Sequence, residues 1–254
     1  MKKSLLFVFT ALVSFGVTDI ARSEGDQKAP RKIDWSFDGV LGTVDKQSAQ
    51  RGFQIYKEVC SACHSLNRIA FRNLSDLGFS EAEVSALAST YQITDGPNDN
   101  GEMFQRPGKA ADSFVPPYPN ENAARAVNHG AAPLDLSLII KARHDGANYV
   151  YSLLTGFSAP PAGVKLVDGQ YYNPYIAGQR LAMPPPLSDN RVTYADGTPA
   201  TLDQEARDVV NFLQWTSEPE MEARKQMGLK VMIYLGIFTA FMFIAKRNLW
   251  RKLH

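Results

Sequence analysis

The longest apolar run of the chain lies close to its C-terminus. Residues 229–245 are apolar apart from Lys230, and four basic residues follow them at once: Lys246, Arg247, Arg251 and Lys252. This length of α-helix extends about 26 Å at ~1.5 Å per residue, slightly less than the hydrocarbon core of a bilayer, and the side chain of Lys230 can reach the headgroups. The pattern predicts a transmembrane helix over 229–245 after a linker over 219–228. The alternative, a buried core helix, is disfavoured by the cations gathered at one end.

A second, shorter apolar run lies at the N-terminus. Residues 4–17 are almost wholly apolar, follow Lys2-Lys3, and precede Ala21-Arg22-Ser23. A basic start, a short apolar segment and a small-x-small sequence are typical of a cleaved signal peptide, here residues 1–23. The alternative, an N-terminal membrane anchor, needs a longer run.

The two ends of the chain predict one topology. Lys and Arg collect on the cytoplasmic side of a membrane helix, so the tail over 246–254 is expected in the cytoplasm. A signal peptide would export residues 24–218 to the other side of the membrane. We therefore expect a single-pass protein of a bacterial inner membrane, with its large domain in the periplasm.

Helical periodicity marks several segments between these runs. Apolar residues at helical spacing over 48–60 predict an amphipathic helix that ends at Cys60. Capping boxes predict helix starts at Ser80 and Thr201, and the second of these helices should end before Glu218-Pro219.

The remaining segments are longer and less regular. Residues 134–144 are predicted to form another helix, stopped by Gly146. Two stretches, 95–122 and 159–197, are rich in Pro, Gly, Asn and Asp. Loops this long are unusual in a compact domain, and wrapping a large planar cofactor is one reason to have them. The expected fold is an all-α domain with long wrapping loops, plus one C-terminal transmembrane helix.

Composition changes the predicted fold and topology little, but the distribution of charge along the chain indicates the kind of partner. The 254 residues are 44% hydrophobic, which is ordinary for a packed core. Residues 24–218 carry 17 Lys and Arg against 23 Asp and Glu, a net charge of −6, whereas residues 219–254 carry 7 against 2, a net charge of +5. An acidic domain repels nucleic acid and attracts a basic soluble partner, although an ordinary solvated surface has the same charge count.

The sequence Cys60-Ser61-Ala62-Cys63-His64 carries the strongest chemical signal. C-x-x-C-H is the attachment motif of a c-type haem, in which both sulfurs bind the porphyrin and the imidazole binds iron. A redox-active cysteine pair would need a βαβ context, and a zinc site would need further thiolates. The chain has only two cysteines. The motif therefore predicts one covalently attached haem c, with His64 as an axial ligand.

The second axial ligand decides whether such a haem binds gas, activates peroxide or carries electrons. Met183 is the favoured candidate because Pro184-Pro185-Pro186 follows it and holds the backbone extended and stiff. Met103 could supply a thioether instead, and His129 or His144 could give bis-histidine ligation.

Several further segments resemble the cytochrome c1 family. The resemblance covers nearly the whole sequence after the signal peptide and ends in the C-terminal membrane helix. It is carried by residues 56–65, Arg106-Pro107-Gly108-Lys109, Pro117-Tyr118-Pro119-Asn120, Ala142-Arg143-His144, residues 149–156, Asn173-Pro174-Tyr175, Met183-Pro184-Pro185-Pro186, and residues 215–219 and 224–228.

The resemblance implies roles for individual residues. Met183 would be the sixth iron ligand, Arg143 would bind a haem propionate, and Tyr149 would line the haem pocket. The alternative for Arg143 is a cation at the C-terminus of a helix that ends near Gly146, where the helix dipole alone favours it. His144 is then expected to be a hydrogen-bonded structural residue.

The resemblance also implies a place in the cytochrome bc1 complex. The chain would carry single electrons from the Rieske iron-sulfur protein to a soluble cytochrome c, with its membrane helix beside cytochrome b, and would not be an enzyme on its own. Three alternatives share some of these features. They are a membrane-tethered cytochrome c that donates to a terminal oxidase, a haem enzyme or gas sensor with five-coordinate iron, and a zinc-stapled binding module.

Overall fold

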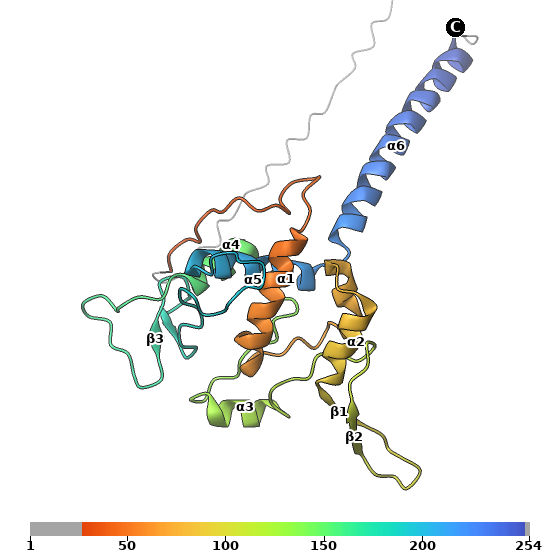
Figure 1. Ribbon diagram of the computed structural model, residues 1–254. Coiled ribbons are helices and arrows are strands. Elements are labelled where there is room, and N and C mark those ends of the chain that lie inside the picture. The colour runs from red at the N-terminus through yellow and green to blue at the C-terminus, as the bar shows by residue number, and fades with distance from the viewer. Residues whose placement is uncertain (1–26, 252–254) are drawn as a thin grey trace, which may run out of the picture.

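The computed structural model describes residues 27–251 (Figure 1). The helices are α1 (Lys46–Glu58), α2 (Glu81–Ser89), α3 (Glu121–Val127), α4 (Gly146–Leu154), α5 (Leu202–Ser217) and α6 (Met221–Trp250), with 3-10 turns at Cys60–Ala62 and Phe71–Leu77. Two short antiparallel pairs complete the regular structure: β1 (Gln92–Asp95) with β2 (Phe104–Pro107), and β3 (Tyr171–Tyr172) with β4 (Arg180–Leu181). The all-α prediction is confirmed. The predicted signal peptide, residues 1–23, lies outside the described residues.

The core forms where α1 crosses α5 (Figure 1). The helices approach closely at Gly52, where a Cβ atom would lie 2.0 Å from the carbonyl oxygen of Asp208, so only glycine fits. Beside this contact, Phe53 and Tyr56 of α1 pack on Phe212 of α5 with ring centroids 5.6 and 5.7 Å apart. Burial of these aromatic rings fixes the orientation of α1 relative to α5, and with it the position of the C-terminal end of α1.

The helix starts that the capping boxes predicted are confirmed. The backbone N–H of Glu83 donates to Ser80 Oγ. In the opposite direction, the backbone N–H of Ser80 donates to the Glu83 carboxylate oxygen Oε2 at 2.8 Å. Thr201 Oγ1 accepts from the N–H of Gln204 at 3.2 Å, and α5 ends at Ser217 as expected.

The prediction of a helix over residues 134–144 is wrong. These residues form turns, and α4 begins at Gly146, where the prediction placed a stop. Asp145 has a left-handed backbone (φ 53°), and a Cβ on Gly146 would lie 1.8 Å from the carbonyl oxygen of Ile140, so the chain folds tightly back on itself before α4. The apolar residues have helical spacing, but this segment forms hydrogen bonds to residues 64–68 instead of the hydrogen bonds of a helix.

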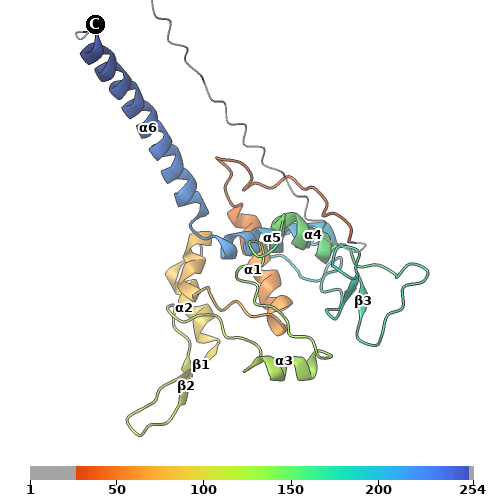
Figure 2. The ribbon, with the colours of Figure 1, turned by 180° about the vertical axis from the view of Figure 1, so that it is seen from behind.

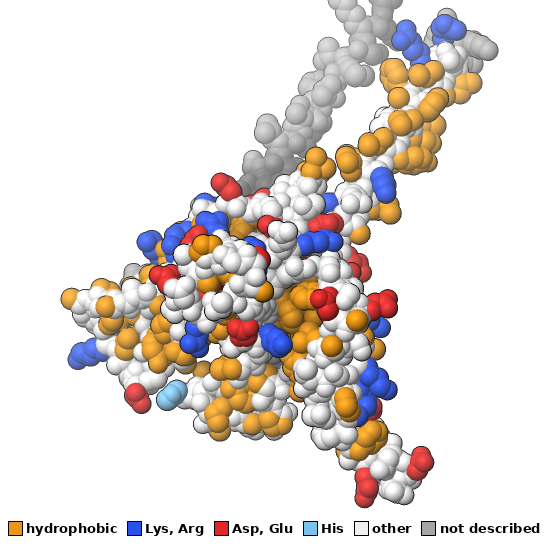
Figure 3. Space-filling view, in the orientation of Figure 1, with side chains coloured by type: hydrophobic (Ala, Val, Ile, Leu, Met, Phe, Trp, Pro, Cys, Tyr) orange, Lys and Arg blue, Asp and Glu red, His pale blue; other side chains and the backbone are white. Residues whose placement is uncertain are grey.

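The C-terminal helix α6 projects away from the domain (Figures 1 and 2). It begins at Met221, so most of the predicted linker over 219–228 is already helical. Its most apolar part has a mean hydropathy of 1.9 and is exposed throughout, which makes it long and apolar enough to cross a membrane. Figure 3 shows this surface as a nearly continuous band of hydrophobic side chains.

Candidate functional site

The Cys60–His64 motif forms a single turn directly after α1. The N–H groups of Cys63 and His64 both donate to the carbonyl oxygen of Cys60, at 3.1 and 2.8 Å. Both cysteines are free thiols; Cys60 is half-buried against the core and Cys63 is exposed. Burial raises the pKa of the Cys60 thiol to about 12, so the sulfur is protonated while it is unmodified. One helical turn thus presents two separate sulfurs and an imidazole together.

The imidazole of His64 is oriented by a backbone carbonyl. His64 Nδ1 lies 2.7 Å from the carbonyl oxygen of Leu134, an acceptor that requires the proton on Nδ1. The other ring nitrogen, Nε2, then carries a lone pair, as a metal-binding histidine requires. Burial lowers the pKa of His64 and so favours the neutral ring.

The loop that supplies this carbonyl is fastened to the motif by Asp135. Its Oδ2 accepts from Ser65 Oγ and from the backbone N–H of Asn67, each at 2.8 Å, and its Oδ1 accepts from the N–H of Ser137 at 2.9 Å. Burial alone would raise the pKa of Asp135, but these hydrogen bonds outweigh it and lower the pKa. The carboxylate therefore holds Leu134 in place as the partner of His64.

Sequence reasoning missed both Leu134 and Asp135. Leu134 acts through its main-chain oxygen, which its side chain does not reveal. The role of Asp135 is visible only in the folded structure, in which its carboxylate lies within hydrogen-bond distance of Ser65 and Asn67.

Met183 comes from a third segment, directly after β4, and is half-buried. The hairpin that precedes it is tied to α4 by fully buried Asn173, whose Nδ2 donates to the carbonyl oxygen of Leu153 at 2.7 Å. The proline-rich segment after it runs along a cavity of about 400 Å³ that Pro185 and Leu187 help to line. Ligation of the same iron by Met183 and His64 stays a prediction.

Arg143 and Tyr149 flank the start of α4. Arg143 is exposed; its guanidinium donates to the carbonyl oxygen of Ala142 at 3.1 Å and has no carboxylate partner within residues 27–251. The interpretation of Arg143 as a helix C-terminal cation is wrong, because the residue precedes α4. Tyr149 is half-buried and packs against the core.

The other candidate ligands lie in different surroundings. Met103 sits in the β1–β2 hairpin with 59% of its surface exposed. His129 has a left-handed backbone (φ 50°) and packs on Gly169, and His144 is exposed. Across the described part of the chain, no group of three or more His, Cys, Asp and Glu side chains could hold a metal ion such as zinc.

These residues fit a covalent haem. Two free thiols and an imidazole with an available Nε2 share one turn, while a thioether and a guanidinium that has no carboxylate partner within residues 27–251 lie on other segments. Apolar side chains beside the motif are exposed, including Leu134 at 54% and Leu138 at 39%. The view in Figure 3 shows hydrophobic side chains in a hollow near the centre of the domain surface that faces the viewer. Exposed apolar surface next to a polar ligand set is what a large macrocycle would cover.

Comparison with known proteins agrees with this chemistry. Residues 35–253 match the family described as "Cytochrome C1 family". The protein "Cytochrome b/c1" of Bradyrhizobium diazoefficiens is 46% identical over 280 residues, which cover 99% of this chain and 41% of that protein. The chain thus spans less than half the length of that relative.

Two further relatives match over more of their length. "Cytochrome c1, heme protein, mitochondrial" of Schizosaccharomyces pombe is 52% identical over 85% of this chain and 71% of its own length. "Cytochrome c1" of Rhodospirillum rubrum is 48% identical over 87% of both chains. The chain belongs to the cytochrome c1 family.

Proposed function

We propose that this chain is the one-electron carrier of a cytochrome bc1 complex. It would pass electrons from the Rieske iron-sulfur protein to a soluble cytochrome c through one covalently bound haem c. The observation that carries the proposal is the Cys60–His64 turn, in which the bond from His64 Nδ1 to the Leu134 carbonyl leaves Nε2 available for iron. Bound haem would supply an iron that takes up and releases single electrons.

Six residues would hold the haem. Cys60 and Cys63 would form thioethers to it, and His64 and Met183 would be its axial ligands. Arg143 would bind a propionate, which is supported by the absence of a carboxylate partner for its exposed guanidinium within residues 27–251, and Tyr149 would line the pocket. The half-buried position of Met183, fastened through its hairpin to α4, supports it over Met103, which is mostly exposed.

Ligation on both faces would leave iron no position for a substrate. A thioether ligand also favours the reduced state relative to bis-histidine ligation. The chain would therefore break no substrate bond itself, and the oxidoreductase activity would belong to the complex.

The partners follow from charge and topology. Residues 24–218 carry a net charge of −6, which supports docking of a basic soluble cytochrome c that weakens as salt screens it. The exposed apolar surface of α6 supports a span that packs beside cytochrome b. The protein would lie in a bacterial inner membrane, with the haem domain in the periplasm and the C-terminus in the cytoplasm.

Purification from membranes, followed by a redox spectrum and a census of the co-purifying subunits, tests the proposal. We expect a covalent c-type haem together with b-type haem and a Rieske cluster. A c-type haem with neither partner would favour the membrane-tethered carrier that feeds a terminal oxidase. A colourless protein would reject haem binding altogether.

A further inference from the structure

The membrane helix leaves the domain through a packed joint. Met221, the first residue of α6, is 3% exposed and belongs to the hydrophobic core. Gln214 of α5 contacts its sulfur, with Nε2 and Sδ 3.7 Å apart. Glu218, in the short connection between the helices, accepts from Arg224 Nε at 2.6 Å and pairs with Lys141 at 3.6 Å. The start of α6 is thus fixed on the side of α5 and of the turn before α4.

An N-terminal segment closes the joint from the other side. We call residues 35–44 the strap. Lys225 of α6 extends its ammonium group into the strap and donates to the carbonyl oxygens of Phe37 at 2.7 Å and Gly42 at 2.9 Å. One turn earlier on α6, Glu222 Oε1 accepts from the backbone N–H of Val44 at 3.0 Å. Two adjacent turns of the membrane helix therefore bind the same segment through charged groups.

The shape of the strap suits this contact. The backbone N–H of Thr43 donates to the carbonyl oxygen of Ser36 at 3.0 Å and closes the segment into a loop. A Cβ on Gly42 would lie 2.0 Å from the carbonyl oxygen of Asp38, so this tight return requires glycine. The loop holds two carbonyl oxygens toward the Lys225 ammonium.

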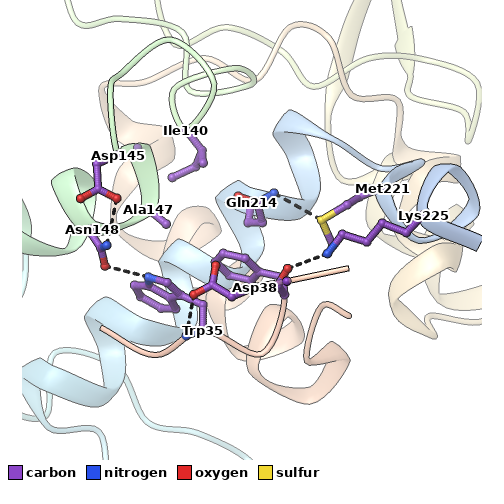
Figure 4. Close-up of a pocket in the computed structure, with 12 residues that line it drawn as sticks. Trp35, Asp38, Ile140, Asp145, Ala147, Asn148, Gln214, Met221 and Lys225 are labelled. Carbon is purple, nitrogen blue, oxygen red and sulfur yellow. Dashed lines mark hydrogen bonds between the residues drawn. The ribbon is translucent and has the colours of Figure 1, made fainter. Parts of the chain in front are cut away.

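The strap also reaches the segment that bears predicted haem-pocket residues. Trp35 stacks on Phe37 with ring centroids 5.4 Å apart, and its Nε1 donates to Asn148 Oδ1 at 2.9 Å (Figure 4). Asn148 lies in α4, directly before Tyr149, and its Nδ2 donates to Asp145 Oδ1 at 2.9 Å. Contacts therefore run continuously from α6 through the strap to α4.

A cavity of about 340 Å³ lies within this joint, bounded by the strap, α4, α5 and α6 (Figure 4). Its polar side chains bind one another and the backbone: Asn148 binds Trp35, Gln214 binds Met221, and Lys225 binds the strap. This satisfaction is typical of a structural joint: among the described residues that line the cavity, no buried polar side chain is left without a partner for a ligand to use.

We propose that the strap, held by Lys225 and Glu222, fixes the orientation of the haem domain on its membrane helix. Lys225 and Glu222 are positioning residues: they would set the distance and angle from which electrons reach the haem while touching neither haem nor electron partner. The inference rests on the proposed function only in that a haem and a membrane are present.

Lys225→Met in the intact complex tests the joint, because methionine keeps the apolar stem and removes the three donors. Loss of a charged hydrogen-bonding group should shift the equilibrium between closed and open strap by roughly ten- to a hundredfold. Amide hydrogen exchange at residues 35–44 should rise by the same factor. The spread of haem orientations, measured by electron paramagnetic resonance of oriented membranes, should broaden.

Lys165→Met is the matched control, since Lys165 is exposed, lies outside the membrane helix, and makes no hydrogen bond or ion pair within the described residues. It should leave both measurements unchanged, and Lys225→Arg should restore most of the protection. If Lys225→Met does not assemble, Glu222→Ala, which removes only the acceptor for Val44, carries the test, with Glu220→Ala as its control.

Faster exchange in the strap with an unchanged spread of haem orientations would overturn the proposal, since the contact would then be local packing only. Unchanged exchange would overturn it as well. A protein without haem would refute the proposed function, while the exchange measurement would still test the joint.

Discussion

The buried carboxylate of Asp208 joins α1 to α5, and its replacement by alanine should be strongly destabilising. Asp208 is fully buried and accepts hydrogen bonds from Ser48 Oγ at 2.6 Å, from Arg51 Nε and Nη2 at 2.9 and 3.0 Å, and from Gln204 Nε2 at 3.0 Å. Removal of one partner of a buried ion pair costs about 3–5 kcal/mol, because it leaves a charge uncompensated. Arg51 keeps a hydrogen bond to exposed Asp196, and its side chain is 16% exposed. The expected loss in free energy of unfolding is therefore at the lower end, about 3 kcal/mol.

Urea unfolding in detergent, followed by far-ultraviolet circular dichroism, measures this loss. A decrease of 3 kcal/mol corresponds to a midpoint lower by about 1 M or more, since the urea dependence is about 1–3 kcal/mol per molar. Asp208→Ala combined with Arg51→Met should recover part of the loss, because the unpaired charge is gone.

An exposed pair on α3 provides the control. Glu121 and Arg125 pair one turn apart with side chains 65% and 50% exposed, so Glu121→Ala should cost no more than about 0.5 kcal/mol. A loss for Asp208→Ala that matches this control, or a double variant no more stable than the single one, would refute the reasoning.

Three further predictions concern the ligand, the turns and acid stability. Met183→Leu should lower the haem midpoint potential while the covalent haem stays attached. Met103→Leu should leave the potential unchanged in the same redox titration. A Met183→Leu protein with the same potential as the natural chain would reject the ligand assignment. Gly146→Ala should lower the thermal midpoint sharply, because its Cβ would lie 1.8 Å from the carbonyl oxygen of Ile140; an unaltered midpoint would contradict the tight turn. Arg106 binds Asp112 through two hydrogen bonds and lowers the pKa of that carboxyl to about 2. A depressed pKa gives stability that is present above about pH 4 and is lost as pH falls toward 2, so Asp112→Asn should flatten the acid part of the stability profile.

Local signals in the sequence were sufficient for much of the fold. A capping bond joins residues three apart, so Ser80 and Thr201 reveal helix starts without knowledge of the tertiary structure. The haem motif is equally local, because five consecutive residues carry both thiols and the imidazole. The apolar run that begins at Leu229 predicts a membrane helix from its length alone.

Long-range contacts decided the rest. Residues 134–144 have helical spacing, but the N–H of Leu136 donates to the carbonyl oxygen of Ser65 at 2.9 Å, and Asp135 binds residues 65–67. These bonds replace a helix with the loop that orients His64. The same limit applies to the strap, whose partners on α6 lie more than 170 residues away along the chain.

The proposed function depends most on an iron that is bound from both sides, by His64 and Met183. Carbon monoxide added to the reduced protein, purified with its complex, tests this directly through the change in the c-type haem spectrum. We predict no change for the natural chain and ready binding for Met183→Leu, in which the sixth position is open. Ready binding by the natural chain, or no binding by Met183→Leu, would contradict the account.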